Sequence, residues 1–332
     1  MVRDPARDAI LLSVAWRMIA QEAPMTAAQF GPPEVESTAR DFATFGAVHL
    51  DVTDGERALG FWRDLVGLAL LGRDGDALRL GAGDRELVVL HPGVSGPVVR
   101  HASGLYHMSF HLPSLAEFAR VFARIEAAGY FQFPTDHGAH LANYVDDPDG
   151  IGLELAFETP PGVRATWGDV QGFEQGDGDG RHWKGRDPRY LAWLASHVPG
   201  GDTRPGLPAG TVVGHMHLRV ADADAALAFY RDAIGFTVNN YVPGRAMFDM
   251  SAGGTFSHRL AGNTWESAGR PQRPAEAAGM RHFTLRLRAE EHLAATIARA
   301  AAAGGQVERR GGDALVVDPS GTRLLLTTSA TR

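Results

Sequence analysis

The sequence predicts an α+β fold built from four βαβββ modules in tandem. Residues 49–68 and 217–236 match one another at a single constant offset. A weaker repeat aligns residues 104–157 with residues 279–328. Each of the four segments opens with strand-type alternation and continues into a pattern typical of an amphipathic helix. Self-similarity of this kind indicates a duplicated supersecondary unit, so the chain is expected to contain four copies of one module.

Length and composition limit the class of protein. With 332 residues, the chain is expected to form roughly two domains. A net charge of −7 and the lack of a basic run argue against nucleic acid as a partner. No apolar run is long enough to predict a membrane span, and we expect a cytoplasmic protein. Because the chain has no cysteine, any metal ligands must come from His, Asp or Glu.

Residues 44–157 form the expected first module pair. Period-two alternation predicts its strands, and 3.6-residue periodicity predicts its helices. The first module is expected to contain a helix over 55–66 and strands over 45–52, 77–80 and 86–90. The second is expected to contain a helix over 115–128 and strands over 105–112, 142–145 and 152–157.

Residues 212–328 form the expected second module pair. Its third module is predicted to contain a strand over 214–220 and a helix over 221–236 that Gly235 closes. Its fourth module is predicted to contain a strand over 280–287, a helix over 290–303 and a hairpin around 318–321. The remaining segments match no module, and we interpret them as an N-terminal extension, 1–43, and an inter-domain crossing, 158–211, with a short helix over 190–197.

Several motifs resemble those of a known superfamily. They are His-x-His-Leu-x-Val at 215–220, Ala-x-x-Phe-Tyr-Arg-Asp-x-x-Gly-Phe at 226–236, and Asp-Pro-Asp/Ser-Gly at 147–150 and 318–321. In tandem βαβββ modules, these motifs resemble the vicinal oxygen chelate superfamily, which has the glyoxalase/bleomycin resistance/extradiol dioxygenase fold. More narrowly, segments 206–220, 258–265 and 144–157 resemble the two-domain catechol 2,3-dioxygenases, or type I extradiol dioxygenases.

The resemblance implies cup-shaped mixed sheets and a metal held by two histidines and one glutamate. The matching first-strand positions of the four modules hold Ala47, His107, His215 and His282. The matching last-strand position holds Glu154 in module two but Leu325 in module four. The expected metal ligands are therefore His107, Glu154 and His215, shared by modules two and three, with His282 as the first alternative ligand. Two histidines and one carboxylate suit Fe(II), with Mn(II) also possible.

The resemblance also implies roles for other residues of the same two modules. Tyr144 matches the active-site tyrosine of the family, His258 its acid–base histidine, and His137 a further histidine beside the site. His217 and His111 share the inward faces of their strands with the expected ligands, and we name them as candidate substrate-binding residues. Taken singly, each of these two histidines is better interpreted as a satisfied core residue than as a substrate contact.

The function implied by the resemblance is extradiol ring cleavage of a catechol-type diol with O₂, catalysed by a metal-dependent dioxygenase. The alternative enzymatic function is that of a glyoxalase-like lyase, which would use the same metal site in the cup-shaped sheet. A non-catalytic protein that binds or sequesters a small molecule is the non-enzymatic alternative, because one fold hosts many functions. The expected partners are a small aromatic substrate and O₂, and homo-oligomer formation is left open.

Overall fold

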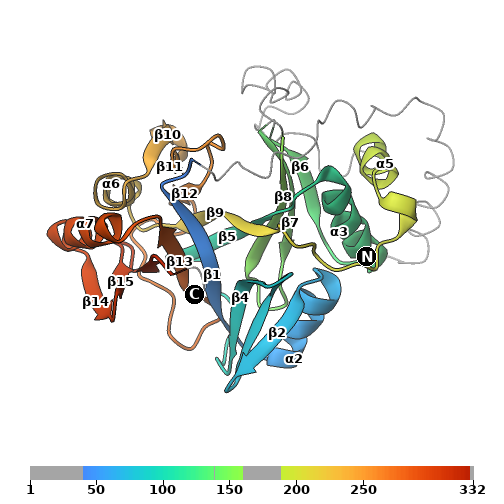
Figure 1. The fold of residues 1–332 in the computed structure, drawn as a ribbon, viewed down its shortest axis with the longest axis horizontal. Helices are drawn as coiled ribbons and strands as arrows, with labels where there is room; N and C mark the ends of the chain where they lie inside the picture. The colour runs from blue at the N-terminus through green and yellow to red at the C-terminus, as the bar shows by residue number, and fades with distance from the viewer. Residues whose placement is uncertain (1–39, 138, 160–187, 330–332) are drawn as a thin grey trace.

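Two eight-stranded mixed sheets form the structure, a computed structural model that describes residues 40–137, 139–159 and 188–329. Figure 1 shows them as two strand layers, with helices at the outer sides of the molecule. Nearly all of the expected N-terminal extension and most of the expected inter-domain crossing lie outside the described residues. The predicted α+β fold of tandem βαβββ modules in cup-shaped sheets is confirmed.

The first sheet joins module one to module four, in the order β14-β15-β16-β13-β1-β4-β3-β2. Its central strands, β1 and β13, are antiparallel, whereas β4 and β16 run parallel to their central neighbours. The strands of this sheet are β1 Ala43–Val52, β2 Ala69–Asp74, β3 Ala77–Ala82, β4 Arg85–Pro92, β13 Gly279–Leu287, β14 Gln306–Arg310, β15 Asp313–Val317 and β16 Arg323–Thr327.

The second sheet joins module two to module three, in the order β10-β11-β12-β9-β5-β8-β7-β6. Here β5 and β9 form the central antiparallel pair, with β8 and β12 parallel to them. The strands are β5 Gly104–His111, β6 Phe133–Asp136, β7 His140–Asp146, β8 Gly152–Glu158, β9 Val212–Arg219, β10 Thr237–Val242, β11 Met247–Ser251 and β12 Leu260–Asn263. Modules two and three therefore share one sheet, as the distribution of candidate ligands predicts.

The helices of modules one and three end differently from the prediction. Each starts as a short α-helix and finishes as a wider π-helical turn: α2 Gly55–Leu59 with η2 Gly60–Leu65, and α6 Ala223–Ala228 with η5 Phe229–Ile234. Asp54 and Asp222 cap their N-termini by accepting backbone N–H groups of Arg57 and Ala225. Gly235 closes η5 with a φ of 112°, a conformation that is unfavourable for residues with a Cβ.

The other helices pack more regularly. They are α3 Leu115–Ala127, α5 Pro188–Ser196 and α7 Glu290–Ala302, with short 3₁₀ turns η4 Pro199–Gly201 and η6 Pro243–Arg245. Phe118, Phe122 and Ile125 recur at helical spacing on α3, and all three are buried, so α3 contributes one apolar face to the core. Figure 1 shows α5 beside α3, on the side opposite α6 and α7. No helix among the described residues is both long and apolar enough to cross a membrane.

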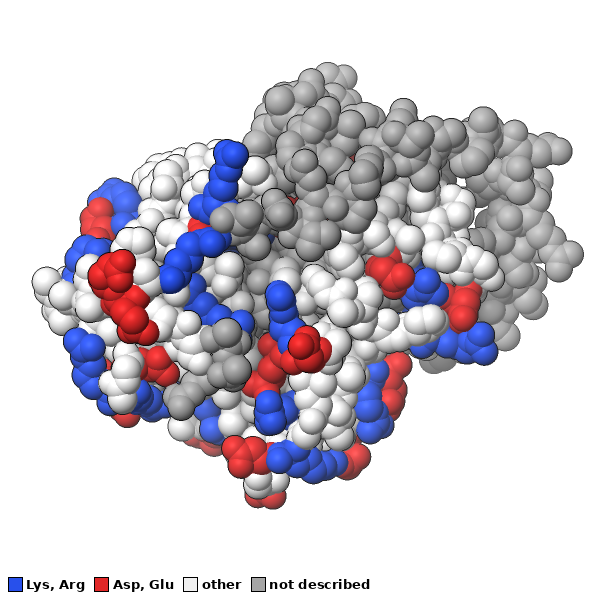
Figure 2. Space-filling model, viewed as in Figure 1, with Lys and Arg blue, Asp and Glu red and all other residues white. Residues whose placement is uncertain are grey.

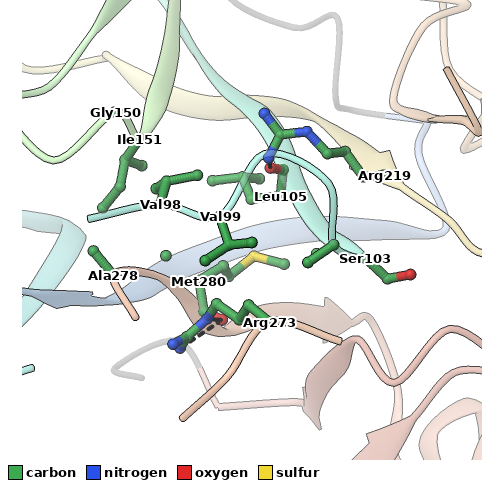
Figure 3. A pocket seen from close by; sticks show the side chains of 13 residues that line it. Val98, Val99, Ser103, Leu105, Gly150, Ile151, Arg219, Arg273, Ala278 and Met280 are labelled. Atoms are coloured by element: carbon green, nitrogen blue, oxygen red, sulfur yellow. Dashed lines mark hydrogen bonds between the residues drawn. The ribbon is translucent and has the colours of Figure 1, made fainter. Parts of the chain in front are cut away.

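The two sheets meet where their central strands approach one another, with β1 near β9 and β13 near β5. A small cavity of about 20 Å³ lies in this contact, between Leu105 and Met280 (Figure 3). Arg219 borders it and donates to the Leu105 carbonyl oxygen at 2.8 Å. The cavity has the volume of about one water molecule, so it has no room for an organic substrate.

The face shown in Figure 2 carries acidic and basic side chains that lie close to one another over its described part. Exposed ion pairs of the molecule include Arg63 with Asp64 and Arg231 with Asp232. Such exposed pairs contribute little to stability, so the fold depends mainly on the apolar core.

Candidate metal centre

The centre of the second sheet brings the three predicted metal ligands together. In the antiparallel pair of β5 and β9, His107 stands opposite His217, and Ser109 stands opposite His215. In the parallel pair of β5 and β8, the same Ser109 stands opposite Glu154. Alternation places these side chains on one face of the sheet, so three adjacent strands supply one cluster.

The separations within this cluster match a single metal ion. His107 Nε2 lies 3.1 Å from Glu154 Oε2, His215 Nε2 lies 3.2 Å from the same oxygen, and the two imidazole nitrogens are 3.4 Å apart. Ligand atoms about 2.1 Å from one ion would be about 3.0 Å apart at right angles and about 3.4 Å apart at tetrahedral angles. The donor set of two imidazoles and one carboxylate, all buried, therefore fits a divalent cation.

Electrostatics favour the metal-binding forms of Glu154 and His215. Burial opposes ionisation of Glu154, but His215 and the contacts from His107 and His140 hold the pKa of Glu154 well below its usual value. Burial lowers the pKa of His215 well below the usual histidine range. An ionised carboxylate and a neutral imidazole are the forms that bind metal ions.

His140 is a neighbour of the cluster that the sequence analysis did not select. Its Nε2 lies 3.0 Å from Glu154 Oε1, the carboxylate oxygen that points away from the other two histidines. The sequence pattern that could have identified His140 is the alternation of β7. It places His140 on the same face of the sheet as Tyr144, four residues further along the strand. A histidine beside a ligating carboxylate can fix the orientation of that carboxylate.

A large cavity opens on the cluster. Its volume is about 750 Å³, and His107, Tyr144 and His258 all line it, together with His137 and His217. Apolar and aromatic side chains form much of the remaining wall, including those of Tyr106, Phe133, Met247 and Trp265. A pocket with apolar walls and a few convergent polar groups is typical of a small-molecule site.

Tyr144 stands on β7 directly opposite Glu154 on β8. Its hydroxyl lies 2.9 Å from His137 Nε2. Burial and the neighbouring Glu154 raise the pKa of Tyr144 well above its usual value. The Tyr144 hydroxyl therefore remains protonated and can donate a hydrogen bond, and His137 lies where it can orient that hydroxyl.

His258 faces the same cavity from the loop before β12. Its Nδ1 lies 3.3 Å from Asp249 Oδ2, and Asp249 also accepts hydrogen bonds from Asn239 and Asn240. Burial raises the pKa of Asp249, but the contact with His258 and the two amides outweighs it, so the net pKa is lowered. Asp249 was not selected from the sequence, because it lies on β11, nine positions before His258, and only strand pairing makes them neighbours.

The two candidate substrate-binding histidines occupy different places. His217 lines the cavity, and its Nε2 accepts a hydrogen bond of 2.8 Å from Asn263. His111 lies behind His215, and both of its ring nitrogens are engaged, one by His215 and one by Glu158. The expectation that His111 contacts the substrate is corrected, because it has no free nitrogen and does not line the cavity.

His282 lies in the other sheet, away from the cluster. It stands opposite His49, and the two rings stack with centroids 4.1 Å apart. The position that corresponds to Glu154 there is Leu325, which pairs with Thr284 as Glu154 pairs with Ser109. The alternative in which His282 completes the cluster is therefore wrong, because the strand order places it in a sheet without a matching carboxylate.

Comparison with known proteins identifies the family. The sequence profile of the Glyoxalase/Bleomycin resistance protein/Dioxygenase superfamily matches residues 44–155 and 212–324. The chain is 32% identical over 278 residues to the catechol-2,3-dioxygenase of Bacillus subtilis (strain 168), an alignment that covers 82% of this chain and 93% of that protein. The crystal structure of glyoxalase I from Zea mays superimposes with a TM-score of 0.52 at 17% identity, covering 87% of this chain and 93% of that one. The profile match extends over all four modules, and the chain belongs to the glyoxalase/bleomycin resistance protein/dioxygenase superfamily.

Proposed function

We propose that this protein is an extradiol dioxygenase that uses Fe(II), or alternatively Mn(II), to cleave the ring of a catechol-type diol with O₂. The observation that carries the proposal is the triangle of His107, Glu154 and His215, together with the cavity that His107 lines alongside Tyr144 and His258. The name of the Bacillus subtilis relative, catechol-2,3-dioxygenase, supports the same reaction class.

His107, Glu154 and His215 would hold the metal through two imidazole nitrogens and one carboxylate oxygen. When bound, an ion with this donor set would supply a Lewis acid and an electron carrier for the reaction of the diol with O₂. The three ligands contribute one negative charge, so a divalent cation leaves the site with a net positive charge that attracts an ionised diol.

Tyr144 would hold one oxygen of the diol. Since burial and Glu154 keep its hydroxyl protonated, Tyr144 donates a hydrogen bond and does not compete as an anion. The contact of 2.9 Å with His137 restrains that hydroxyl on the cavity wall. A preorganised donor of this kind stabilises charge that develops on the substrate during reaction.

His258 would carry a proton between the diol and the oxygen that adds to the ring. Its Nδ1 faces Asp249, so Nε2 is the nitrogen left to exchange a proton with the reactants. Asp249 is itself held by Asn239 and Asn240, and it therefore orients the ring of His258 in the manner of a carboxylate–histidine pair. The aromatic side chains in the cavity wall would provide flat surfaces for the substrate ring.

The test is anaerobic reconstitution with Fe(II), followed by mixing with a panel of catechols in oxygenated buffer. We expect consumption of one O₂ for each diol, measured with an oxygen electrode, and a yellow ring-fission product measured by absorbance. Metal binding without O₂ uptake, but with turnover of a hemithioacetal, would favour a lyase. A protein that binds neither Fe(II) nor Mn(II) would favour a non-catalytic binding role.

A substitution at His258 separates chemistry from metal binding. His258→Ala is expected to retain the metal, as measured by elemental analysis, while turnover falls by about 10²–10⁴-fold through loss of proton transfer. His292→Ala, on the exposed face of α7, is the control and is expected to retain full turnover. Loss of the metal from the His258→Ala protein would contradict the assignment of His258 as an acid–base group.

A further inference from the structure

A chain of polar side chains that do not line the cavity leads away from His215. His215 Nδ1 lies 2.9 Å from His111 Nε2, and His111 Nδ1 lies 2.7 Å from Glu158 Oε1. Beyond it, Arg259 donates to the same Glu158 oxygen at 3.0 Å and to Asp41 at 2.9 Å. His215 is fully buried, and His111, Arg259 and Asp41 are each at most 4% exposed.

Glu158, the carboxylate that contacts His111 in this chain, determines where the protons lie. Glu158, paired with the Arg259 guanidinium, can only accept hydrogen bonds, so His111 must carry its proton on Nδ1. The neutral His111 ring then presents a lone pair at Nε2, which accepts a proton from His215 Nδ1. His215 Nε2 is thereby left as a lone pair, and it is this nitrogen that faces His107 and Glu154.

The other tautomer of His215, with the proton on Nε2, would prevent metal binding. With its proton on Nε2, His215 would donate to Glu154 Oε2 across the 3.2 Å contact, and that nitrogen could not coordinate an ion. His215 Nδ1 and His111 Nε2 would then be two lone pairs 2.9 Å apart without a proton between them. The two tautomers compete, and the position of Glu158 favours the one that binds metal.

We propose that His111 and Glu158 are positioning residues that fix the tautomer and ring orientation of His215 so that its Nε2 is presented to the metal. The proposal rests on the proposed function only in taking His215 as a metal ligand, and it holds for any reaction that the metal supports. Hydrogen bonds of this kind to a ligating histidine raise its basicity and hold its ring in place.

The packing around His111 is consistent with a restrained ring. Gly214 lies against it so closely that a Cβ at this position would stand 2.0 Å from two ring carbons of His111. Phe256 meets the same ring edge to face, with centroids 4.9 Å apart, and the Arg259 guanidinium carbon lies 4.7 Å from the centre of the Phe256 ring. His111 is therefore confined between a side-chain-free backbone segment and an aromatic ring.

The other sheet lacks two of the three ligands, since only His282 stands there at the position of His107, and it also lacks the counterpart of His111. The strand register shows the equivalence, since His111 pairs with Val212 as Arg286 pairs with Thr44. Arg286 thus occupies the position of His111, in the sheet where Ala47 occupies the position of His215. The positioning histidine is present in the sheet that has the complete ligand set, and an arginine stands at its position in the sheet that does not.

The experiment measures tautomer and metal affinity separately. In the metal-free protein, long-range ¹H–¹⁵N NMR correlations of His215 should show the proton on Nδ1, which requires no metal and no activity. Mn(II) affinity, measured by electron paramagnetic resonance, should fall about 10–100-fold in His111→Phe, which keeps an aromatic ring but removes both hydrogen bonds. His111→Gln, which can accept from His215 and donate to Glu158, should recover most of that affinity.

Phe256→Leu is the matched control, because it loosens the packing of the His111 ring without removing a hydrogen bond. We expect its Mn(II) affinity to remain within about threefold of the wild type, although its midpoint of urea denaturation falls because a buried side chain is shortened. A wild-type His215 protonated on Nε2, an unchanged Mn(II) affinity in His111→Phe, or a wild-type protein that binds no Mn(II) would each overturn the proposal. If Mn(II) binding and the His215 tautomer are as expected but no O₂ is consumed, the proposed dioxygenase reaction is rejected. The proposed role of His111 and Glu158 then still stands. If His111→Phe does not fold, the proposal is still tested by the Mn(II) affinity of His111→Gln and by the NMR identification of the protonated nitrogen of His215.

Discussion

Glu154 supplies the negative charge of the candidate metal centre, and its two oxygens contact three histidines. Replacing it with glutamine keeps the shape of the side chain but removes the charge that balances a cation. We expect Glu154→Gln to lose Mn(II) binding to below about one hundredth of the wild-type affinity, because the remaining imidazoles are neutral ligands. Isothermal titration with Mn(II) measures this.

The control for that substitution is Glu308→Gln on the exposed edge strand β14, whose carboxylate pairs only with Arg310 among the described residues. It is expected to bind Mn(II) like the wild type. Full Mn(II) occupancy in Glu154→Gln would place the carboxylate outside the ligand set and would leave His107 and His215 to bind through another arrangement.

At the scale of elements, the geometry of the site depends on how closely β8 approaches β5. Gly152 permits that approach, since a Cβ there would stand 2.4 Å from the Tyr106 carbonyl oxygen and 3.2 Å from His107 Cβ. Gly152→Ala should therefore push β8 away from β5 and shift Glu154 relative to His107. We expect Mn(II) affinity to fall at least about tenfold and the unfolding free energy by about 1–3 kcal/mol.

Gly60→Ala provides the comparison for this strand effect. Gly60 has a helical φ of −55°, and a Cβ there would meet nothing within 4 Å. Chemical denaturation should show Gly60→Ala to be as stable as the wild type or more stable by about 0.5–1 kcal/mol, with unchanged Mn(II) affinity. If Gly152→Ala and Gly60→Ala bind Mn(II) with equal affinity, the expected displacement of Glu154 by the Cβ at position 152 is contradicted.

The elements also show where sequence patterns lose information. None of the four outermost strands, β2, β6, β10 and β14, was assigned individually from the sequence. Three of them, β2, β10 and β14, are largely exposed or half-buried. An edge strand with no covered face lacks the apolar alternation that predicts a strand, so its sequence resembles a loop.

At the scale of the whole molecule, two equivalent sheets differ in their central polar residues. In the sheet without the cluster, burial lowers the pKa of His282 to about 4 and that of His49 to about 3. Between pH 6.5 and about 4, an unfolded His282 binds a proton that the folded one does not. Stability contributed by the neutral His282 is therefore present above pH 6.5 and is lost as the pH falls through that range.

His282→Gln removes this proton linkage. We expect the unfolding free energy of the variant to depend less steeply on pH between 4 and 6.5, by up to about 1.4 kcal/mol per pH unit, measured by urea denaturation. Asp147 and Asp318, whose pKa values burial raises to about 6, have the opposite dependence, but they are present in both proteins and cancel in the comparison. One bound metal per chain should remain in the variant, and an unchanged pH slope would contradict the pKa assigned to His282.

The sequence by itself determined the module plan and the chemistry of the candidate site. The repeat around His49 and His217 reveals the duplication, and strand alternation indicates that His107, His215 and Glu154 face inward, because both signals are local. The fold class was therefore predicted correctly, and the contrast between Glu154 and Leu325 pointed to modules two and three.

Only the tertiary structure decided how those modules meet. Whether β5 pairs with β9 depends on hydrogen bonds between segments more than 100 positions apart, and no local pattern records that pairing. For the same reason, His140, Asp249 and the role of His111 could not be assigned from the sequence. A buried polar side chain takes its function from the partner that satisfies it, and that partner is chosen by packing across strands.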